Sequence, residues 1–224
     1  MPRQLSFDLP AIPALGREDF FVSPSNAAAT AMIENWQGWP ARKLALCGPP
    51  GAGKTHLAHV WAAQSGAVIL QAADLPATDI AALDPSHAAV EDADSLAGDP
   101  AGERALLHLH NLVLAEGHSL LLTARRAPGF WPVVLPDLAS RMQATPAVVL
   151  AEPDDTLLLA VMMKLFSDRQ LLPTPETLPY LARRMPRSFE TARRVVSALD
   201  RASLASGRRI TRALAAQVLD ELDL

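Results

Sequence analysis

The chain has 224 residues, half of them hydrophobic, which excludes a disordered protein and suits one large domain or a domain with a small lid. Its net charge of −4 combines −7 over residues 1–174 (eleven Lys and Arg against eighteen Asp and Glu) with +3 over residues 175–224 (nine Arg against six acids). No apolar run is long enough to cross a bilayer, and the N-terminus lacks the pattern of a signal peptide, so we expect a cytoplasmic protein.

The first dozen residues are predicted to lie outside the fold. Pro10, Pro13 and Gly16 prevent regular structure, and we assign residues 1–16 to a flexible tail. Apolar side chains on a free tail bury nothing within the chain, so they favour docking to a partner, although a tail of chance composition is equally compatible. The candidate docking residues are the apolar Leu5, Phe7 and Leu9 and the polar Gln4.

A helix is predicted to follow the segment 20–26. Ser23 and Pro24 suit an N-cap and a first helical position, and the helix is expected to run through Ala27–Trp36. Phe20 and Val22 lie upstream of the first strand of a phosphate-binding motif, where apolar residues often form the pocket for a base. They are equally compatible with a place in the core.

The stretch 48–55 is the feature around which the chain is organised. It fits the P-loop pattern G-x-x-x-x-G-K-[ST], between an apolar strand over 43–47 and a helix that ends near Gly66. Glycines let consecutive backbone N–H groups turn around an anion, and the next helix points its positive end at the same phosphates. The predicted residues for binding ATP or ADP are Gly48, Pro49, Pro50, Gly51, Ala52, Gly53, Lys54, Thr55 and His56.

Three residues in and beside this stretch have specific predicted roles. Lys54 is expected to reach the β and γ phosphates, and the hydroxyl of Thr55 to bind Mg²⁺. Cys47, the only cysteine, cannot form an internal disulfide and is expected to be a packing residue at the end of a buried strand.

A strand over 87–92 follows a strand over 67–71 and a polar loop, and it ends in two acids. An apolar strand that delivers carboxylates completes a P-loop site. Glu91 is expected at the metal and Asp92 where a side chain orients the attacking water. Because Asp is usual in the first place, Glu91 is expected to hold the metal through water.

Two more strands are predicted over 119–123 and 147–150, with helices over 106–115 and 135–141. Thr123 can hydrogen-bond a water or the γ-phosphate, or act only as a strand-end cap. Alternating strands and helices predict an α/β domain over residues 17–152 with a parallel five-stranded sheet covered on both faces.

Residues 153–224 are predicted to form a small all-helical lid. The pattern becomes wholly helical there, with apolar stripes at helical spacing. The positive balance of this part suits a nucleotide, a nucleic acid or an acidic protein, or is only the solvated face of helices.

Over nearly its whole length the chain resembles AAA+ ATPases of the DnaA/Hda family of bacterial replication proteins. Phe20–Asn26 is similar to the entry segment of the initiator, Val90–Asp92 to its acidic strand, and Leu122–Pro128 to its sensor 1 region. Leu135–Arg141 and Leu199–Ser203 are closest to the regulatory, Hda-type branch. The resemblance implies an AAA+ P-loop core with a helical lid.

The resemblance also implies partners and an activity. Hda-type proteins carry a clamp-binding hexapeptide at the N-terminus, which Gln4–Leu9 resembles, and lack the initiator's DNA-binding domain. The implied partners are therefore DnaA and the β sliding clamp of DNA polymerase III, with a homodimer left open and no direct sequence-specific DNA binding. The implied activity is promotion of DnaA-bound ATP hydrolysis, with Arg141 as a trans arginine finger whose planar, permanent charge suits the role.

One position departs from the family. The sensor 2 Arg of the lid falls on Glu190, so Arg187 or Arg194 would have to substitute, and Arg194 is included among the nucleotide-binding residues. We therefore expect weak intrinsic ATPase activity. Two alternatives are a helicase-loader-type ATPase that binds single-stranded DNA, which the acidic core and few aromatics disfavour, and a nucleotide-independent adaptor.

Overall fold

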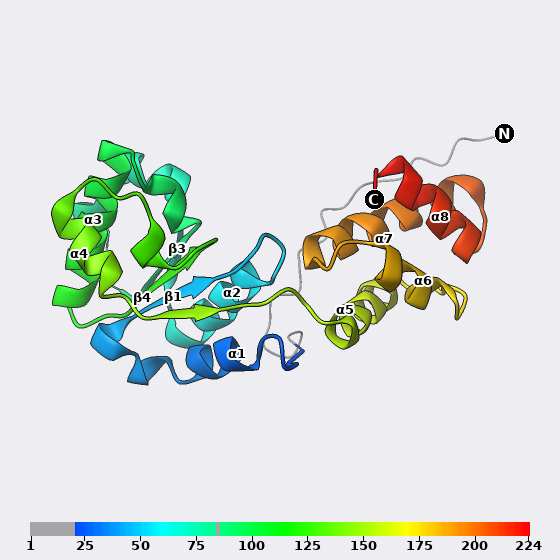
Figure 1. The fold of residues 1–224 in the computed structure, drawn as a ribbon, viewed down its shortest axis with the longest axis horizontal. Helices are drawn as coiled ribbons and strands as arrows, with labels where there is room; N and C mark the ends of the chain where they lie inside the picture. Colours follow the sequence, from blue (N-terminus) through cyan, green and yellow to red (C-terminus); the bar gives the residue numbers. More distant parts are fainter. Residues whose placement is uncertain (1–20, 84–85) are drawn as a thin grey trace.

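The structure is a computed structural model that describes residues 21–83 and 86–224, so the tail with Gln4, Leu5, Phe7 and Leu9, and also Phe20, lie outside the described residues. Figure 1 shows two lobes, an α/β core and a helical lid. The strands form one all-parallel sheet in the order β2-β3-β4-β1-β5. They are β1 (Lys43–Cys47), β2 (Val68–Gln71), β3 (Ala88–Glu91), β4 (Leu120–Ala124) and β5 (Ala147–Val149).

In the described residues, four α-helices belong to the core and four to the lid. Those of the core are α1 (Ala27–Glu34), α2 (Lys54–Ser65), α3 (Pro100–Ala115) and α4 (Pro136–Gln143). Those of the lid are α5 (Asp155–Asp168), α6 (Thr177–Arg184), α7 (Phe189–Ser206) and α8 (Arg212–Glu221). No helix in the described ranges combines the length and apolar character that a membrane span requires.

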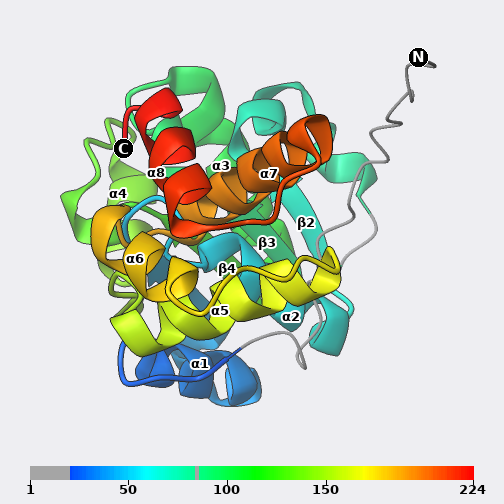
Figure 2. The same ribbon diagram turned by 90° about the vertical axis from the view of Figure 1, so that its right-hand side faces the viewer.

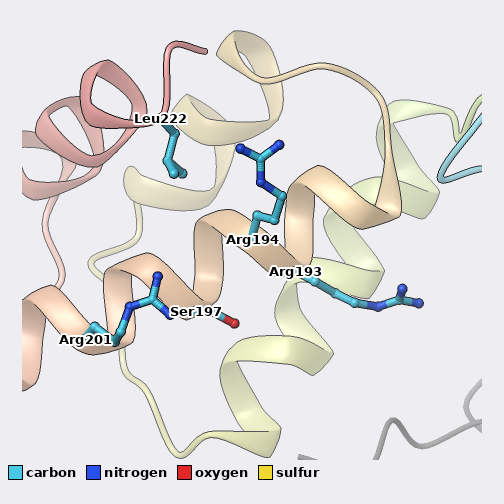
Figure 3. Close-up of a pocket in the computed structure, with 5 residues that line it drawn as sticks. All are labelled: Arg193, Arg194, Ser197, Arg201 and Leu222. Carbon is cyan, nitrogen blue, oxygen red and sulfur yellow. The ribbon is translucent and has the colours of Figure 1, made fainter.

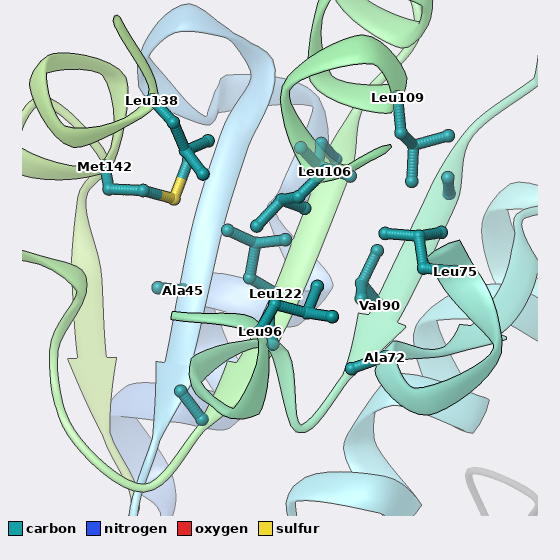
Figure 4. Close-up of a cluster of buried hydrophobic side chains, with 14 of the residues drawn as sticks. Ala45, Ala72, Leu75, Val90, Leu96, Leu106, Leu109, Leu122, Leu138 and Met142 are labelled. Atoms are coloured by element: carbon teal, nitrogen blue, oxygen red, sulfur yellow. The ribbon is translucent and has the colours of Figure 1, made fainter. Parts of the chain in front are cut away.

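The central strands β1, β3 and β4 are buried on both faces, as their continuous apolar runs predict, whereas the edge strands β2 and β5 are partly exposed. Successive side chains of a strand point to opposite faces. Ala45 and Cys47 of β1 therefore pack with α3 and α4 (Figure 4), whereas Leu44 and Leu46 pack with α1 and α2. The predicted packing role of Cys47 is confirmed, since its side chain is buried and burial raises the pKa of its thiol to about 11.

The lid has a hydrophobic core of its own, to which all four of its helices contribute. Phe166 of α5, Leu181 of α6, Val195 of α7 and Val218 of α8 are among its buried side chains. The helices of the lid lie at one end of the molecule (Figure 1), and Figure 2 views the molecule from that end, with the lid in front of the sheet. The chain enters the lid after β5.

Two helices begin at residues other than those expected. α1 begins at Ala27, because the chain forms a turn over 24–26 in which Ser23 O accepts the amides of Asn26 and Ala27. α3 begins at Pro100 rather than at 106, because Asp99 caps its first amides. The first turns of α3 lack large apolar residues at helical spacing, so the sequence pattern did not reveal them.

Candidate nucleotide-binding site

The P-loop leaves the carboxyl end of β1 and runs into α2, the place where parallel α/β sheets bind ligands. Gly51 and Gly53 adopt φ angles of 73° and 102°, which disfavour any residue with a Cβ. A Cβ on Gly51 would also lie 2.0 Å from the hydroxyl oxygen of Ser188, so the lid approaches the loop closely there. The loop residues that were predicted from the motif are thus brought together around one turn.

Lys54 lies inside this turn. Its buried ammonium donates to Gly48 O at 2.8 Å and to Pro49 O at 3.0 Å. Burial lowers the pKa of Lys54, while Asp92 and Asp94 act in the opposite direction. Phosphate oxygens are stronger acceptors for an ammonium than backbone carbonyls are, so the geometry suits a phosphate as an alternative partner.

The acidic strand end is built as the motif requires. Glu91 is buried at the end of β3, and its Oε2 accepts from Nε2 of Gln71 at 2.8 Å. Its Oε1 is buried and has no hydrogen-bond partner among the described residues. A buried carboxylate oxygen without a partner is costly unless a further donor or a cation reaches it.

Asp92 and Thr123 are brought together across neighbouring strands. The Thr123 hydroxyl oxygen accepts from the amide of Asp92 at 3.0 Å, and Asp92 has a φ of 53°, which turns its exposed side chain away from the strand. The hydroxyl proton of Thr123 stays available to a further acceptor. The strand-end cap and the ligand contact, which the sequence left as alternatives, are therefore compatible.

The residues present fit Mg²⁺. This ion binds proteins through one or two carboxylates and keeps waters and substrate phosphates as its other ligands. The described residues contain no group of three or more His, Cys, Asp or Glu side chains that could hold a metal alone. Glu91, with its unpartnered oxygen, and the exposed hydroxyl of Thr55 at the start of α2 are the side chains that suit it.

The entry segment is tied to the lid. Asn26 accepts from Ser23 N and donates to Phe21 O, each at 2.8 Å, and the side chains of Phe21 and Val22 stay largely exposed. Asp154, the N-cap of α5, is hydrogen-bonded by Leu157 N and by Ser23 and Ser25, which together lower its pKa. A partly exposed apolar segment thus lies beside the start of α5.

The start of α7 packs on the P-loop. Phe189 N donates to Gly51 O at 2.9 Å, and its ring would contact a Cβ on Gly53. Arg187 precedes this contact and pairs with Asp155 at 2.9 Å, whereas Arg194 lines a cavity on the lid, away from these contacts (Figure 3). Of the two substitutes for a sensor 2 Arg, Arg187 is therefore the one adjacent to the loop.

Arg141 lies at the other end of β1. Its carbonyl oxygen accepts from Nζ of Lys43, the first residue of β1, at 3.0 Å, while the P-loop follows the last residue of that strand. Five residues of strand span roughly 13–16 Å, so Arg141 does not face its own P-loop. Its guanidinium is held by Asp137 through Nε–Oδ1 at 3.0 Å and Nη2–Oδ2 at 3.3 Å.

A buried carboxylate that no sequence motif singled out holds the segment before α4. Glu103 is 1% exposed and accepts from the amides of Gly98, Val134 and Leu135, which fixes the entry to α4. Burial alone would raise the pKa of Glu103, but the three amides outweigh it and the net shift is downward. A charged residue on the apolar face of α3 was the signal that could have revealed it.

The comparisons with known proteins identify the fold. No family model matches the chain. An uncharacterized protein of Haemophilus influenzae is 25% identical over 221 residues, which cover 94% of this chain and 96% of that protein.

Solved structures are similar over most of the chain. Domain III of the replication initiation protein DnaA from Thermotoga maritima matches with a TM-score of 0.81 at 19% identity, over 95% of this chain and 98% of that one. A RuvB mutant from Thermotoga maritima matches with a TM-score of 0.71 at 18% identity, over 92% of this chain and 71% of that one. DnaA bound to AMPPCP and single-stranded DNA matches with a TM-score of 0.68 at 18% identity, over 94% of this chain and 68% of that one. The chain therefore has the AAA+ fold, with a P-loop α/β core and a helical lid, as DnaA domain III has it.

Proposed function

We propose that this chain is a nucleotide-binding AAA+ regulator of the Hda type, which promotes hydrolysis of the ATP bound to the initiator DnaA. The observation that carries the proposal is the placement of Arg141, oriented by Asp137 at the end of β1 that lies away from the chain's own P-loop. An arginine in that position serves a nucleotide held by another molecule. The likeness to DnaA domain III supports a DnaA-type partner, because AAA+ subunits of one shape can pack in one geometry.

The chain's own nucleotide is proposed to be ATP or ADP. The loop from Gly48 to Thr55 holds the phosphates with Lys54, and Thr55 and Glu91 hold Mg²⁺, which supplies charge neutralisation at the phosphates when bound. Asp92 orients water, and Thr123 fixes the backbone of Asp92. The neighbour that carries AMPPCP supports an adenine nucleotide.

Intrinsic turnover is proposed to be slow. Arg187 is held by Asp155, and the Cβ of Glu190 would lie 3.3 Å from a Cβ on Gly51, so an acidic residue stands next to the P-loop where the family has its Arg. A carboxylate near the P-loop opposes the further negative charge of a γ-phosphate. The nucleotide of this chain therefore serves regulation more than catalysis.

The tail with Gln4, Leu5, Phe7 and Leu9 is proposed to dock on the β sliding clamp. Replacement of Gln4, Phe7 and Leu9 by Ala is expected to abolish clamp binding in a pull-down without lowering thermal stability, because the tail precedes the folded core. Undiminished binding would place the clamp contact elsewhere.

The proposal is tested by single-turnover hydrolysis of ATP bound to DnaA, with the clamp on DNA and this protein added. Arg141→Ala is expected to lower the stimulated rate by roughly 10³–10⁵, the range known for arginine fingers. Arg141→Lys is expected to rescue it poorly, because an ammonium cannot form the planar fork.

The matched control is Arg104→Ala, which removes an exposed arginine of the same lobe and is expected to leave the rate unchanged. Folding, nucleotide binding and clamp binding are expected to stay intact in both variants. If Arg141→Ala stimulates as well as the parent does, the finger mechanism is wrong and an adaptor role replaces it.

A further inference from the structure

The lid carries a cavity that the proposed function does not use. It has a volume of about 270 Å³ and is lined by Arg193, Arg194, Ser197, Arg201 and Leu222. Figure 3 shows Ser197 between Arg193 and Arg201 along α7, with the side chain of Arg194 on the side of Leu222 and that of Arg193 extending away from Arg201. All three arginines are exposed.

The spacing of these residues follows from the helix. Arg193, Ser197 and Arg201 recur at i, i+4 and i+8, so they share one face of α7 and span roughly 12 Å. Arg169, the residue that follows α5, adds a fourth guanidinium, since its Nη2 donates to the Ser197 hydroxyl oxygen at 3.2 Å. Ser197 thus lies between two arginines of α7 and contacts a third from the end of α5.

The acids of the lid do not neutralise this cluster. Within residues 21–83 and 86–224, Arg193, Arg194 and Arg201 form no ion pair, whereas Asp155 and Asp168 pair with Arg187 and Lys164. Like charges gathered around one cavity repel each other, which costs free energy that a bound anion would recover. The cluster is therefore suited to an anionic ligand.

The lining indicates the chemistry of that ligand. Guanidinium groups and a hydroxyl offer hydrogen-bond donors in the planar, paired geometry that phosphates accept. Anionic groups spaced along a chain would meet arginines spaced along a helix. Among the described residues, no aromatic, Asn or Gln side chain lines the cavity to stack on a base or to bind the edge of an adenine.

We propose that this face of α7 binds successive phosphates of a nucleic-acid backbone, without reading the sequence. The proposal goes beyond the proposed regulation of DnaA and does not depend on it, because it involves neither Arg141 nor the P-loop. Contacts of this kind position a protein on nucleic acid and carry no sequence information.

The test is fluorescence anisotropy with a labelled 20-base-pair duplex, its single strand and a second duplex of unrelated sequence, each at several salt concentrations. For three phosphate contacts the slope of log affinity against log salt is expected to be about −2.7 for duplex, so binding falls about 40-fold between 50 and 200 mM salt. Arg193→Gln with Arg201→Gln is expected to reduce the slope to about −0.9 and the fall to about fourfold. The two duplexes are expected to bind alike.

A charge-matched control separates the cavity from total charge. Arg104→Gln with Arg183→Gln removes one exposed arginine from each lobe and none from the cavity, and it is expected to keep the parent's slope. Circular dichroism of both variants checks that the lid stays folded.

Several results would overturn the proposal. They are an unchanged slope in the Arg193→Gln, Arg201→Gln variant, an equal loss in the control variant, and a preference for one duplex sequence. Binding of a polyglutamate peptide in place of DNA would identify an acidic protein as the ligand instead.

Discussion

The two ends of strand β1 are built differently. At the carboxyl end, Lys54 rests on two carbonyls of its own loop, and one oxygen of Glu91 has no partner among the described residues. At the amino end, Lys43, His110 and Arg141 all have partners within the chain. The polar groups at the carboxyl end are suited to hydrogen-bond a ligand. The polar groups at the amino end already have hydrogen-bond partners within the chain.

The difference follows from what each end has to do. A ligand-binding site must offer hydrogen-bond donors and acceptors to the ligand. Its affinity falls if strong hydrogen bonds within the protein have to be broken first. A side chain that acts on another molecule must instead be held in one orientation, because misplacement costs rate. Substitutions at the two ends should therefore have different consequences, which the following predictions examine.

The largest effect on stability is expected at Glu103. Glu103→Leu removes the acceptor of three backbone amides and should lower the free energy of unfolding by about 3–5 kcal/mol, since hydrogen bonds to charged groups contribute about 1.5–3 kcal/mol each and apolar burial offsets part of the loss. Urea unfolding followed by tryptophan fluorescence reports on the core, because all four tryptophans lie there. A loss below 1 kcal/mol would show that α4 is held by other contacts.

His110 makes the amino end sensitive to acid. Burial, and then the charge of Lys43, lowers the pKa of His110 from 6.5 to about 4. Between these values the unfolded chain binds a proton that the folded chain does not, so stability present above pH 6.5 is lost as the pH falls, by roughly 2–3 kcal/mol at pH 4.5.

His110→Gln should remove this part of the pH dependence. Urea unfolding at pH 7 and pH 4.5 measures it for parent and variant, and the lowered pKa of Glu103, whose stabilisation is also lost in acid, acts equally in both. Equal pH dependence in the two proteins would contradict the assignment to His110.

Lys54→Ala should act at the other end on binding rather than on stability. Loss of charge-assisted hydrogen bonds, at about 1.5–3 kcal/mol, is expected to weaken ADP and ATP binding by about 10- to 100-fold. Titration with a fluorescent nucleotide measures it, with Lys164→Ala as the control lysine on the lid. Unchanged affinity would show that the phosphates do not occupy this loop.

The smallest effect is expected from Asp137→Ala. The Arg141–Asp137 pair is solvent-exposed, and such pairs contribute about 0.3–0.5 kcal/mol, so the stimulated hydrolysis of DnaA-bound ATP should fall by about twofold. Asp137→Glu should restore part of the rate. A rise in the rate would show that Asp137 restrains Arg141 instead of orienting it.

Local features of the chain were predictable because their physics is local. The motif from Gly48 to Thr55 places glycines where positive φ angles occur, and apolar runs mark all five strands of the sheet. Short-range sterics and periodicity were sufficient for these elements.

The pairings between distant segments were decided by the tertiary structure. Lys43 contacts Arg141 across 98 residues, and Phe189 reaches Gly51 from another domain. Glu103 has an unremarkable place in the sequence, and its role appears only when the chain before α4 packs on α3. Such contacts depend on the register of strands and on the docking of helices, which no local pattern encodes, because many partners of similar chemistry compete for each polar group until packing selects one.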